Sequence, residues 1–99
     1  MPTPKLLSSL GLARKAGALV IGSAPVLEAI RRETPGLVLI SSDLSAGGAK
    51  KLKTACEFHK IPWRVIPHTM SELSDALGKS ASVGAVAVLK KPILHLFEN

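Results

Sequence analysis

The chain has 99 residues, of which 46% are hydrophobic and 20% are charged, and this balance predicts one globular domain over residues 1–99 rather than a disordered tail. Thirteen Lys and Arg residues against seven Asp and Glu residues leave a net charge of +6, which favours a polyanionic partner. Two Phe, one Trp and no Tyr exclude a surface that stacks many bases on rings, and the single Cys excludes an internal disulfide framework.

The first quarter of the chain predicts helix, strand and helix. Pro4 opens a helix whose apolar residues recur at spacings of three and four, and Gly17 ends it. A short strand is expected at 19–21. Ser23 is then the expected N-cap of a second helix, in which Pro25 is tolerated because it lies in the first turn.

The middle of the chain repeats this alternation. The continuous apolar run 37–40 predicts a strand that is covered on both faces. Ser45 is the expected N-cap of a third helix, with Leu52 and Cys56 facing inward and the lysines mostly outward. A third strand is expected at 63–66.

The last third of the chain predicts a helix, a strand and a final short helix. Thr69 and Glu72 have capping-box spacing at the start of a helix that Gly78 ends. The uncharged run 83–89 predicts another buried strand, and it is far too short for the roughly 20 residues of a membrane span. Pro92 starts the final helix, with apolar positions at Ile93, Leu96 and Phe97.

Helices and strands that alternate in this way predict an α/β fold, in which helices cover both faces of one sheet in a three-layer α-β-α sandwich. A single cysteine and the absence of a cleavable apolar leader in the sequence favour a cytoplasmic location, with no membrane partner.

The sequence contains no strong enzyme signature, and we expect no catalytic residues, no metal and no cofactor. Cys56 and His59 share a helix face, but no second Cys or His pair has the spacing that a structural zinc site needs. Gly47 and Gly48 open a helix that could cradle phosphate, yet they lack the spacing of a phosphate-binding loop. A nucleotide-binding protein therefore remains a weaker alternative.

Cationic residues lie at several helix ends and loops, where they could together form a phosphate-binding surface. Each cluster alone is also compatible with a solvated helix face. These residues are Arg14, Lys15, Arg31, Arg32, Lys50, Lys51, Lys53 and Lys79.

Motifs in matching order resemble those of the ribosomal protein L7Ae superfamily, whose members bind kink-turn RNA, and within it the small bacterial YlxQ branch. The resemblance covers roughly residues 5–90 and begins with Leu10-Gly11-Leu12-Ala13-Arg14-Lys15-Ala16-Gly17 and Val20-Ile21-Gly22. It continues through 37–43, the Lys50-Lys51-Leu52 helix, 56–62 and 72–78, and ends at 83–88.

This resemblance implies a mixed four-stranded sheet and a non-enzymatic protein that binds sharply bent, structured RNA in connection with ribosomes or translation, with ribosome-associated proteins as further partners and no DNA. Irregular bends expose base edges that a regular RNA duplex hides. The implied contacts are the start of the second helix and the loop before the last strand. The expected RNA-binding residues are Arg14, Lys15, Gly22, Ser23, Ala24, Pro25, Arg31, Arg32, Lys79, Ser80, Ala81, Ser82 and Val83.

The chain departs from the family pattern at the start of the second helix. Ala24 and Pro25 stand where RNA-binding relatives carry a polar pair, and Glu28 stands where they carry a lysine. Each lost base contact costs about 1–3 kcal/mol. These residues are what the alternative predicts, namely a protein-interaction module on the same fold that has lost specific RNA readout.

Overall fold

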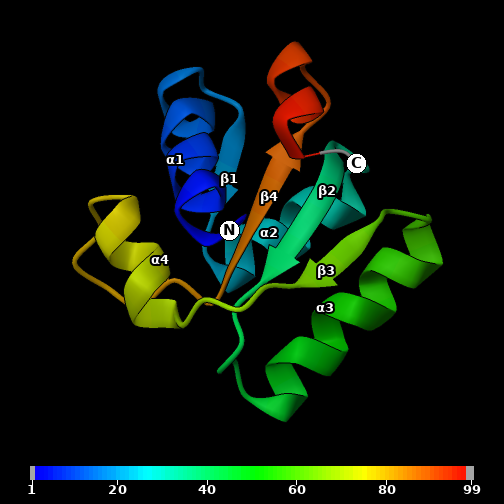
Figure 1. Ribbon diagram of the computed structural model, residues 1–99. Helices are drawn as coiled ribbons and strands as arrows, with labels where there is room; N and C mark the ends of the chain where they lie inside the picture. Colours follow the sequence, from blue (N-terminus) through cyan, green and yellow to red (C-terminus); the bar gives the residue numbers. More distant parts are fainter. Residues whose placement is uncertain (1, 98–99) are drawn as a thin grey trace.

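The structure is a computed structural model that describes residues 2–97, and it contains one four-stranded sheet with helices on both faces (Figure 1). The observed order confirms the predicted alternation of helices and strands. The elements are α1 (Pro2–Lys15), β1 (Leu19–Ile21), α2 (Ser23–Arg31), β2 (Pro35–Ile40), α3 (Ala46–His59), β3 (Trp63–Val65), α4 (Met70–Ala76), β4 (Ala85–Leu89) and the 3-10 helix η1 (Pro92–Phe97).

The sheet is mixed, and its strand order is β1-β4-β2-β3. The last strand in the sequence, β4, therefore lies in the middle, antiparallel to both β1 and β2, whereas β2 and β3 are parallel. As a result, β1, β2 and β3 end where β4 begins, at the lower end of the sheet in Figure 1. We call this end, with its connecting segments 22–25, 41–45, 66–70 and 78–84, the loop edge.

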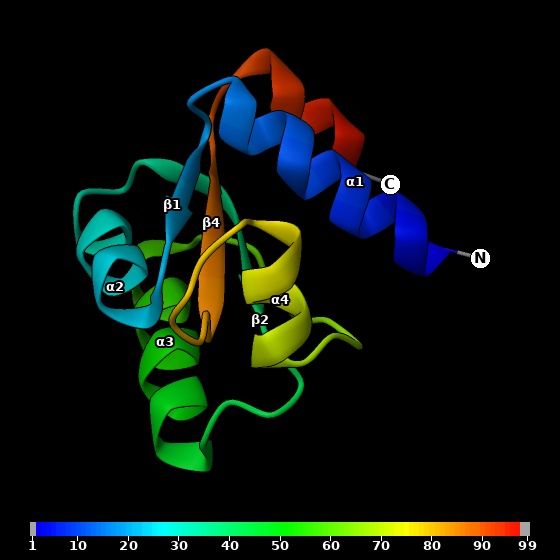
Figure 2. The same cartoon turned by 90° about the vertical axis from the view of Figure 1, so that its left-hand side faces the viewer.

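Each face of the sheet is covered by its own helices, as the edge-on view in Figure 2 shows. One buried cluster joins α1, α4 and η1 to the sheet through residues such as Leu10, Leu73 and Val86. The second joins α2 and α3 to the other face through residues such as Ile30 and Leu52. Burial of one such side chain stabilises a fold by about 1.5–3 kcal/mol, and these two clusters confirm the three-layer sandwich.

The helix ends follow from local chemistry, with two corrections, the first being that α1 begins at Pro2 rather than at Pro4. Ser45 caps α3, since its Oγ accepts from the amide of Gly48 at 3.2 Å, and Thr69 and Glu72 form the predicted capping box. Ser23, however, is not an N-cap: it is the first residue of α2. Gly22 takes the N-cap position with φ of 106°, a conformation that glycine adopts without strain.

Strand bounds differ slightly from the expected ones. β2 begins at Pro35, which pairs with Leu89 across an irregularity in the ladder, and β4 begins at Ala85 because the segment before it belongs to the loop edge. In η1 the side chain of Phe97 is buried as expected. The side chains of Ile93 and Leu96 lie outside the described part of the chain.

Candidate nucleic-acid interface

The start of α2 and the loop that precedes β4 meet at the loop edge. A Cβ added to Gly84 would lie 2.7 Å from Ser23 Oγ and 2.8 Å from Leu44 Cδ1, so only a glycine allows this approach. The amide of Ser41 donates to the carbonyl of Gly84 at 3.0 Å, which fixes the loop against the end of β2. Two of the predicted RNA-binding segments, 22–25 and 79–83, therefore adjoin one another.

Gly22 sets the direction in which α2 leaves the sheet. Its amide donates to the carbonyl of Ala85 at 2.9 Å, and its carbonyl accepts from the amide of Val26 at 2.9 Å. The amide of Gly22 is thus used within the protein, and the first amides of α2 that remain for a ligand are those of Ser23 and Ala24, because Pro25 has none. Ala24 and Pro25 are exposed.

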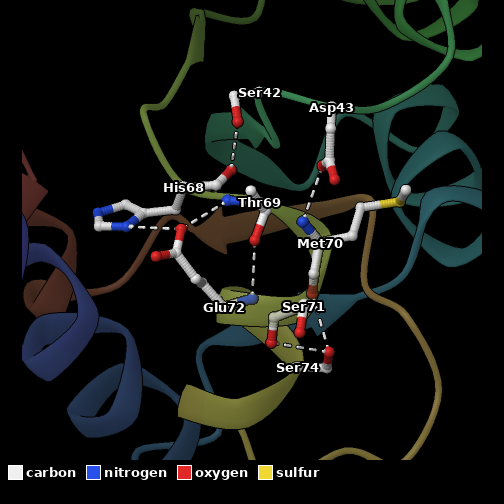
Figure 3. Close-up of polar contacts among 8 residues, drawn as sticks. All are labelled: Ser42, Asp43, His68, Thr69, Met70, Ser71, Glu72 and Ser74. Atoms are coloured by element: carbon white, nitrogen blue, oxygen red, sulfur yellow. Dashed lines mark hydrogen bonds and ion pairs between the residues drawn. The ribbon is translucent and has the colours of Figure 1, made fainter.

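The other two connections of the loop edge are joined to each other by hydrogen bonds (Figure 3). The amide and the hydroxyl of Ser42 donate to the carbonyl of His68 at 2.8 and 3.2 Å. Asp43 accepts from the amide of Met70 at 2.8 Å through its Oδ1. Met70 also lies against the glycine loop, with its sulfur 3.7 Å from the Cβ position of Gly84. These contacts make the loop edge a continuous scaffold.

His68 belongs to the interior of this scaffold. Its side chain is 1% exposed, its Nδ1 lies 3.8 Å from Glu72 Oε1, and its Nε2 has no partner among the described protein atoms. A side chain this deeply buried does not contact a ligand at the surface. His68 therefore packs beneath the loop edge and holds its segments in position.

Arg14 and Lys79 flank the loop that precedes β4. The guanidinium of Arg14 donates to the carbonyl of Leu77 at the end of α4, so this cation is engaged within the protein. Gly78 follows in the left-handed conformation with φ of 66°, and the amide of Lys79 donates to Ser74 at 2.8 Å. All three cations are exposed, but only Arg14 is held by this hydrogen bond and therefore anchors the beginning of the loop.

Arg31 and Arg32 lie away from the loop edge, at the C-terminal end of α2. Both are exposed and form ion pairs with Glu28, at 3.9 Å for Arg31 and 3.7 Å for Arg32. Exposed pairs of this kind contribute about 0–1 kcal/mol, so a stronger anion readily competes for these cations. The structure thus separates these two predicted residues from the remaining predicted residues.

The residues that the sequence offered for a metal or phosphate site are buried or already bonded within the protein. Cys56 is fully buried in the α2–α3 core, and burial raises the pKa of its thiol to about 11. His59 Nδ1 lies 2.9 Å from Glu33 Oε2. Within residues 2–97, no group of three or more His, Cys, Asp or Glu side chains is placed to hold a metal ion. The amide of Gly48, which a phosphate would need, already donates to Ser45.

The family model of the ribosomal protein L7Ae/L30e/S12e/Gadd45 family matches residues 4–94 of this chain, and so spans the whole loop edge. The chain belongs to this family. It is 35% identical over 74 residues to the RNA-binding protein YlxQ of Bacillus subtilis, covering 75% of this chain and 73% of that protein. It is 28% identical over 79 residues to the RNA-binding protein YlxQ of Enterococcus faecium, covering 80% and 76%.

Two solved structures share the fold of this chain. A Bacillus halodurans protein of unknown function superposes with a TM-score of 0.81 at 32% identity, covering 92% of this chain and 91% of that one. The 15.5kD RNA binding protein of Giardia lamblia superposes with a TM-score of 0.76, covering 94% and 78%. At 22% identity this second likeness shows the fold alone.

Sequence reasoning missed three members of the loop edge in this L7Ae-family protein. Leu44, Met70 and Gly84 pack together beside Ser23, although each comes from a different connection. None of the three was expected to be a site residue, although Gly84 lies in the run 83–88 that resembles the family. Their proximity follows from the position of β4 in the middle of the sheet, which no local pattern indicates.

Proposed function

We propose that this protein binds bent, structured RNA through the loop edge. The observation that carries the proposal is the contact between Ser23 and Gly84, which brings the start of α2 and the segment 79–83 into one surface. The relatives named as RNA-binding proteins support the same ligand class. Because the contact surface is a helix start and a loop rather than a row of rings, it suits RNA whose bases are displaced by a bend.

The position of each residue determines the RNA contact that we assign to it. The free amides at the start of α2 and the exposed residues 79–82 contact the bend, since amides at a helix N-terminus attract anionic oxygen atoms. Val83 is 3% exposed and packs in the core, so it positions the loop rather than contacting the RNA. Lys15 and Lys79 supply phosphate contacts beside the bend. Arg14 holds the loop in place, and Arg31 and Arg32 contact phosphates further along α2.

The departures at Ala24 and Pro25 determine how this protein reads its RNA. Neither side chain offers a hydrogen bond to a base edge, and recognition therefore depends on shape and backbone rather than on side-chain readout of a base pair. In this proposal the protein has no enzymatic activity and acts in the cytoplasm on ribosomal or other translation-related RNA.

The variant Ala24→Glu tests the proposed surface. Ala24 is exposed in the first turn of α2, where a carboxylate stabilises the helix by roughly 0.3–1 kcal/mol. The same carboxylate repels phosphate at the loop edge. We expect unfolding at higher urea concentration together with RNA binding weakened about tenfold or more, corresponding to roughly 1.4 kcal/mol.

The matched control is Ser8→Glu, which places the same charge on an exposed position of α1. This control is expected to retain the wild-type affinity for a bent RNA. If Ala24→Glu and Ser8→Glu bind that RNA equally well, the loop edge is not the binding surface.

A further inference from the structure

A groove lies between α2 and α3, and of its lining residues only Arg31 has a place in the proposed RNA contacts. Its volume is about 530 Å³, within the range typical of small-ligand sites. It extends from Gly47 in the first turn of α3 to His59 in the last turn. The lining residues are Leu27, Arg31, Gly47, Lys50, Lys51, Thr54, Ala55, Phe58 and His59.

The charge of this groove has one sign. Arg31, Lys50 and Lys51 line it, and none of its lining residues is acidic. Lys53 is not part of the groove, because its ammonium lies over the ring of Trp63, 5.1 Å from the ring centre. The nearby carboxylate of Glu33 is bound to His59 at 2.9 Å, and Glu28 is paired with Arg31 and Arg32. The groove therefore attracts an anion.

Phe58 adds an exposed aromatic ring to this cationic groove. Its side chain is 80% exposed, although it is one of only two Phe residues in the chain. The ring meets His59 in a T-shaped arrangement, with ring centres 5.0 Å apart, and its high exposure leaves most of the Phe58 ring for another ring. An aromatic face beside lysines fits a nucleobase with its phosphates, because every base has a face that can stack.

The groove is continuous with the loop edge. Leu44 of the loop edge lies 2.8 Å from the Cβ position of Gly84 and 3.4 Å from that of Gly48, the neighbour of the groove residue Gly47. Leu27 lies one turn beyond Ser23 on α2 and lines the groove. In both views the first turns of α3 extend below the end of the sheet (Figures 1 and 2). A strand bound at the loop edge can therefore run directly into the groove.

We propose that the α2–α3 groove binds a single-stranded RNA segment that flanks the bend, with one base stacked on Phe58 and backbone phosphates on Arg31, Lys50 and Lys51. This inference rests on the proposed function and adds a second contact region to it. The continuity with the loop edge favours RNA over an acidic peptide, which would share the charge but not the base stacking.

The test compares three RNAs by fluorescence titration: a kink-turn core, the same core with a six-nucleotide single-stranded uridine extension at one end, and the core with that extension at the other end. Wild-type protein is expected to bind an extended RNA more tightly than the bare core. Phe58→Ala, at an exposed position, should remove this difference, a loss of about tenfold, and leave the affinity for the bare core unchanged.

Lys50→Gln with Lys51→Gln tests the phosphate contacts. For the extended RNA, this double variant should reduce the slope of log affinity against log salt concentration by the equivalent of up to about two phosphate contacts. The matched control is Lys90→Gln with Lys91→Gln, which removes the same charge after the end of β4, opposite the loop edge. If both double variants reduce the salt dependence equally, the effect comes from the net charge of the protein and not from contacts in the groove.

Two further outcomes overturn the inference. One is that neither extension improves wild-type binding, and the other is that Phe58→Ala weakens the bare core as much as the extended RNA. If no RNA with a bend binds, the proposed function fails, and the groove is then tested separately by nuclear magnetic resonance with a free six-nucleotide oligouridine. Chemical-shift changes at Lys50, Lys51 and Phe58 would support RNA binding in the groove. Equal chemical-shift changes and equal affinity with hexaglutamate would show that the groove binds negative charge and does not recognise bases.

Discussion

Gly84 and Ser23 are in direct van der Waals proximity, although one precedes the last strand and the other begins the second helix. A Cβ on Gly84 would lie 2.7 Å from Ser23 Oγ, closer than side-chain carbon atoms approach oxygen in folded proteins. The strand order β1-β4-β2-β3 produces this proximity, because it places β4 directly beside β1. The proposed RNA-binding surface depends on it.

Gly84→Ala should therefore destabilise the fold and weaken RNA binding. The added methyl group meets Ser23 and Leu44 and forces one of them to move, a kind of overpacking that costs about 1–3 kcal/mol. Urea unfolding and titration with bent RNA measure the two effects. Gly11→Ala is the matched control, since nothing lies within 4 Å of its Cβ position and alanine stabilises a helix by about 0.5–1 kcal/mol. A neutral Gly84→Ala would contradict the close approach.

Arg14→Ala should loosen the loop that precedes β4. The guanidinium satisfies a carbonyl at the end of α4, where orphan carbonyls and the helix dipole favour a cation, and its loss should cost about 1 kcal/mol. Hydrogen exchange of the Lys79 amide, which donates to Ser74, is expected to become faster than in wild type. Lys15→Ala is the control, and equal protection of Lys79 in both variants would exclude an anchoring role for Arg14.

Replacing Arg31 and Arg32 together with Ala should weaken RNA binding and flatten its salt dependence by up to about two phosphate contacts. The physical reason is that exposed cations at the end of α2 release counterions when they meet phosphate. Binding titrations at several salt concentrations give the slope. An unchanged affinity and slope would remove both residues from the binding surface.

The thiol of Cys56 should be unreactive in the folded protein. Burial, with a smaller effect from Glu57, raises its pKa from 9.0 to about 11, so the reactive thiolate is scarce at neutral pH. Because the pKa is higher in the folded state, this group favours folding below pH 9.0, and its contribution is lost as the pH rises toward 11. Labelling with a disulfide reagent at pH 8 should follow global unfolding, and fast labelling of native protein would contradict the prediction.

Glu33 should titrate below its ordinary range. The hydrogen bond from His59 and the charge of that imidazole lower the pKa of the Glu33 carboxyl from 4.5. A lowered pKa in the folded state means that the pair favours folding above pH 4.5 and that this contribution fades as the pH falls further. Carboxyl chemical shifts measured against pH check this, with Glu33→Gln as the reference. A midpoint at or above 4.5 would show that the pair does not form in solution.

Much of the fold was predictable because its signals are local. Apolar runs marked the central strands, and the capping box at Thr69 and Glu72 marked the start of α4. The N-cap of α2 was assigned to Ser23 because serine is a common cap. A positive-φ glycine took that position instead, and its conformation is set by the hydrogen bond from Gly22 to Ala85 across the sheet.

The candidate site was predictable only in part, because it depends on which connections meet. The segments 22–25 and 79–83 followed from the family resemblance. Nothing in the sequence distinguishes Leu44 and Met70 from other apolar residues, and only the strand order brings their loops together. The role of Phe58 could not be predicted either, since a helical pattern does not show whether a neighbouring helix leaves a groove beside an exposed ring.

The most direct test of the account is a fluorescence titration of wild-type protein with a kink-turn RNA and with a straight duplex of matched length and composition, repeated at several salt concentrations. Recognition of shape by the loop edge predicts a preference for the bent RNA that persists at moderate salt. Equal affinity for both RNAs, falling steeply and in parallel as salt increases, would contradict the account, because it is the behaviour of a general basic surface.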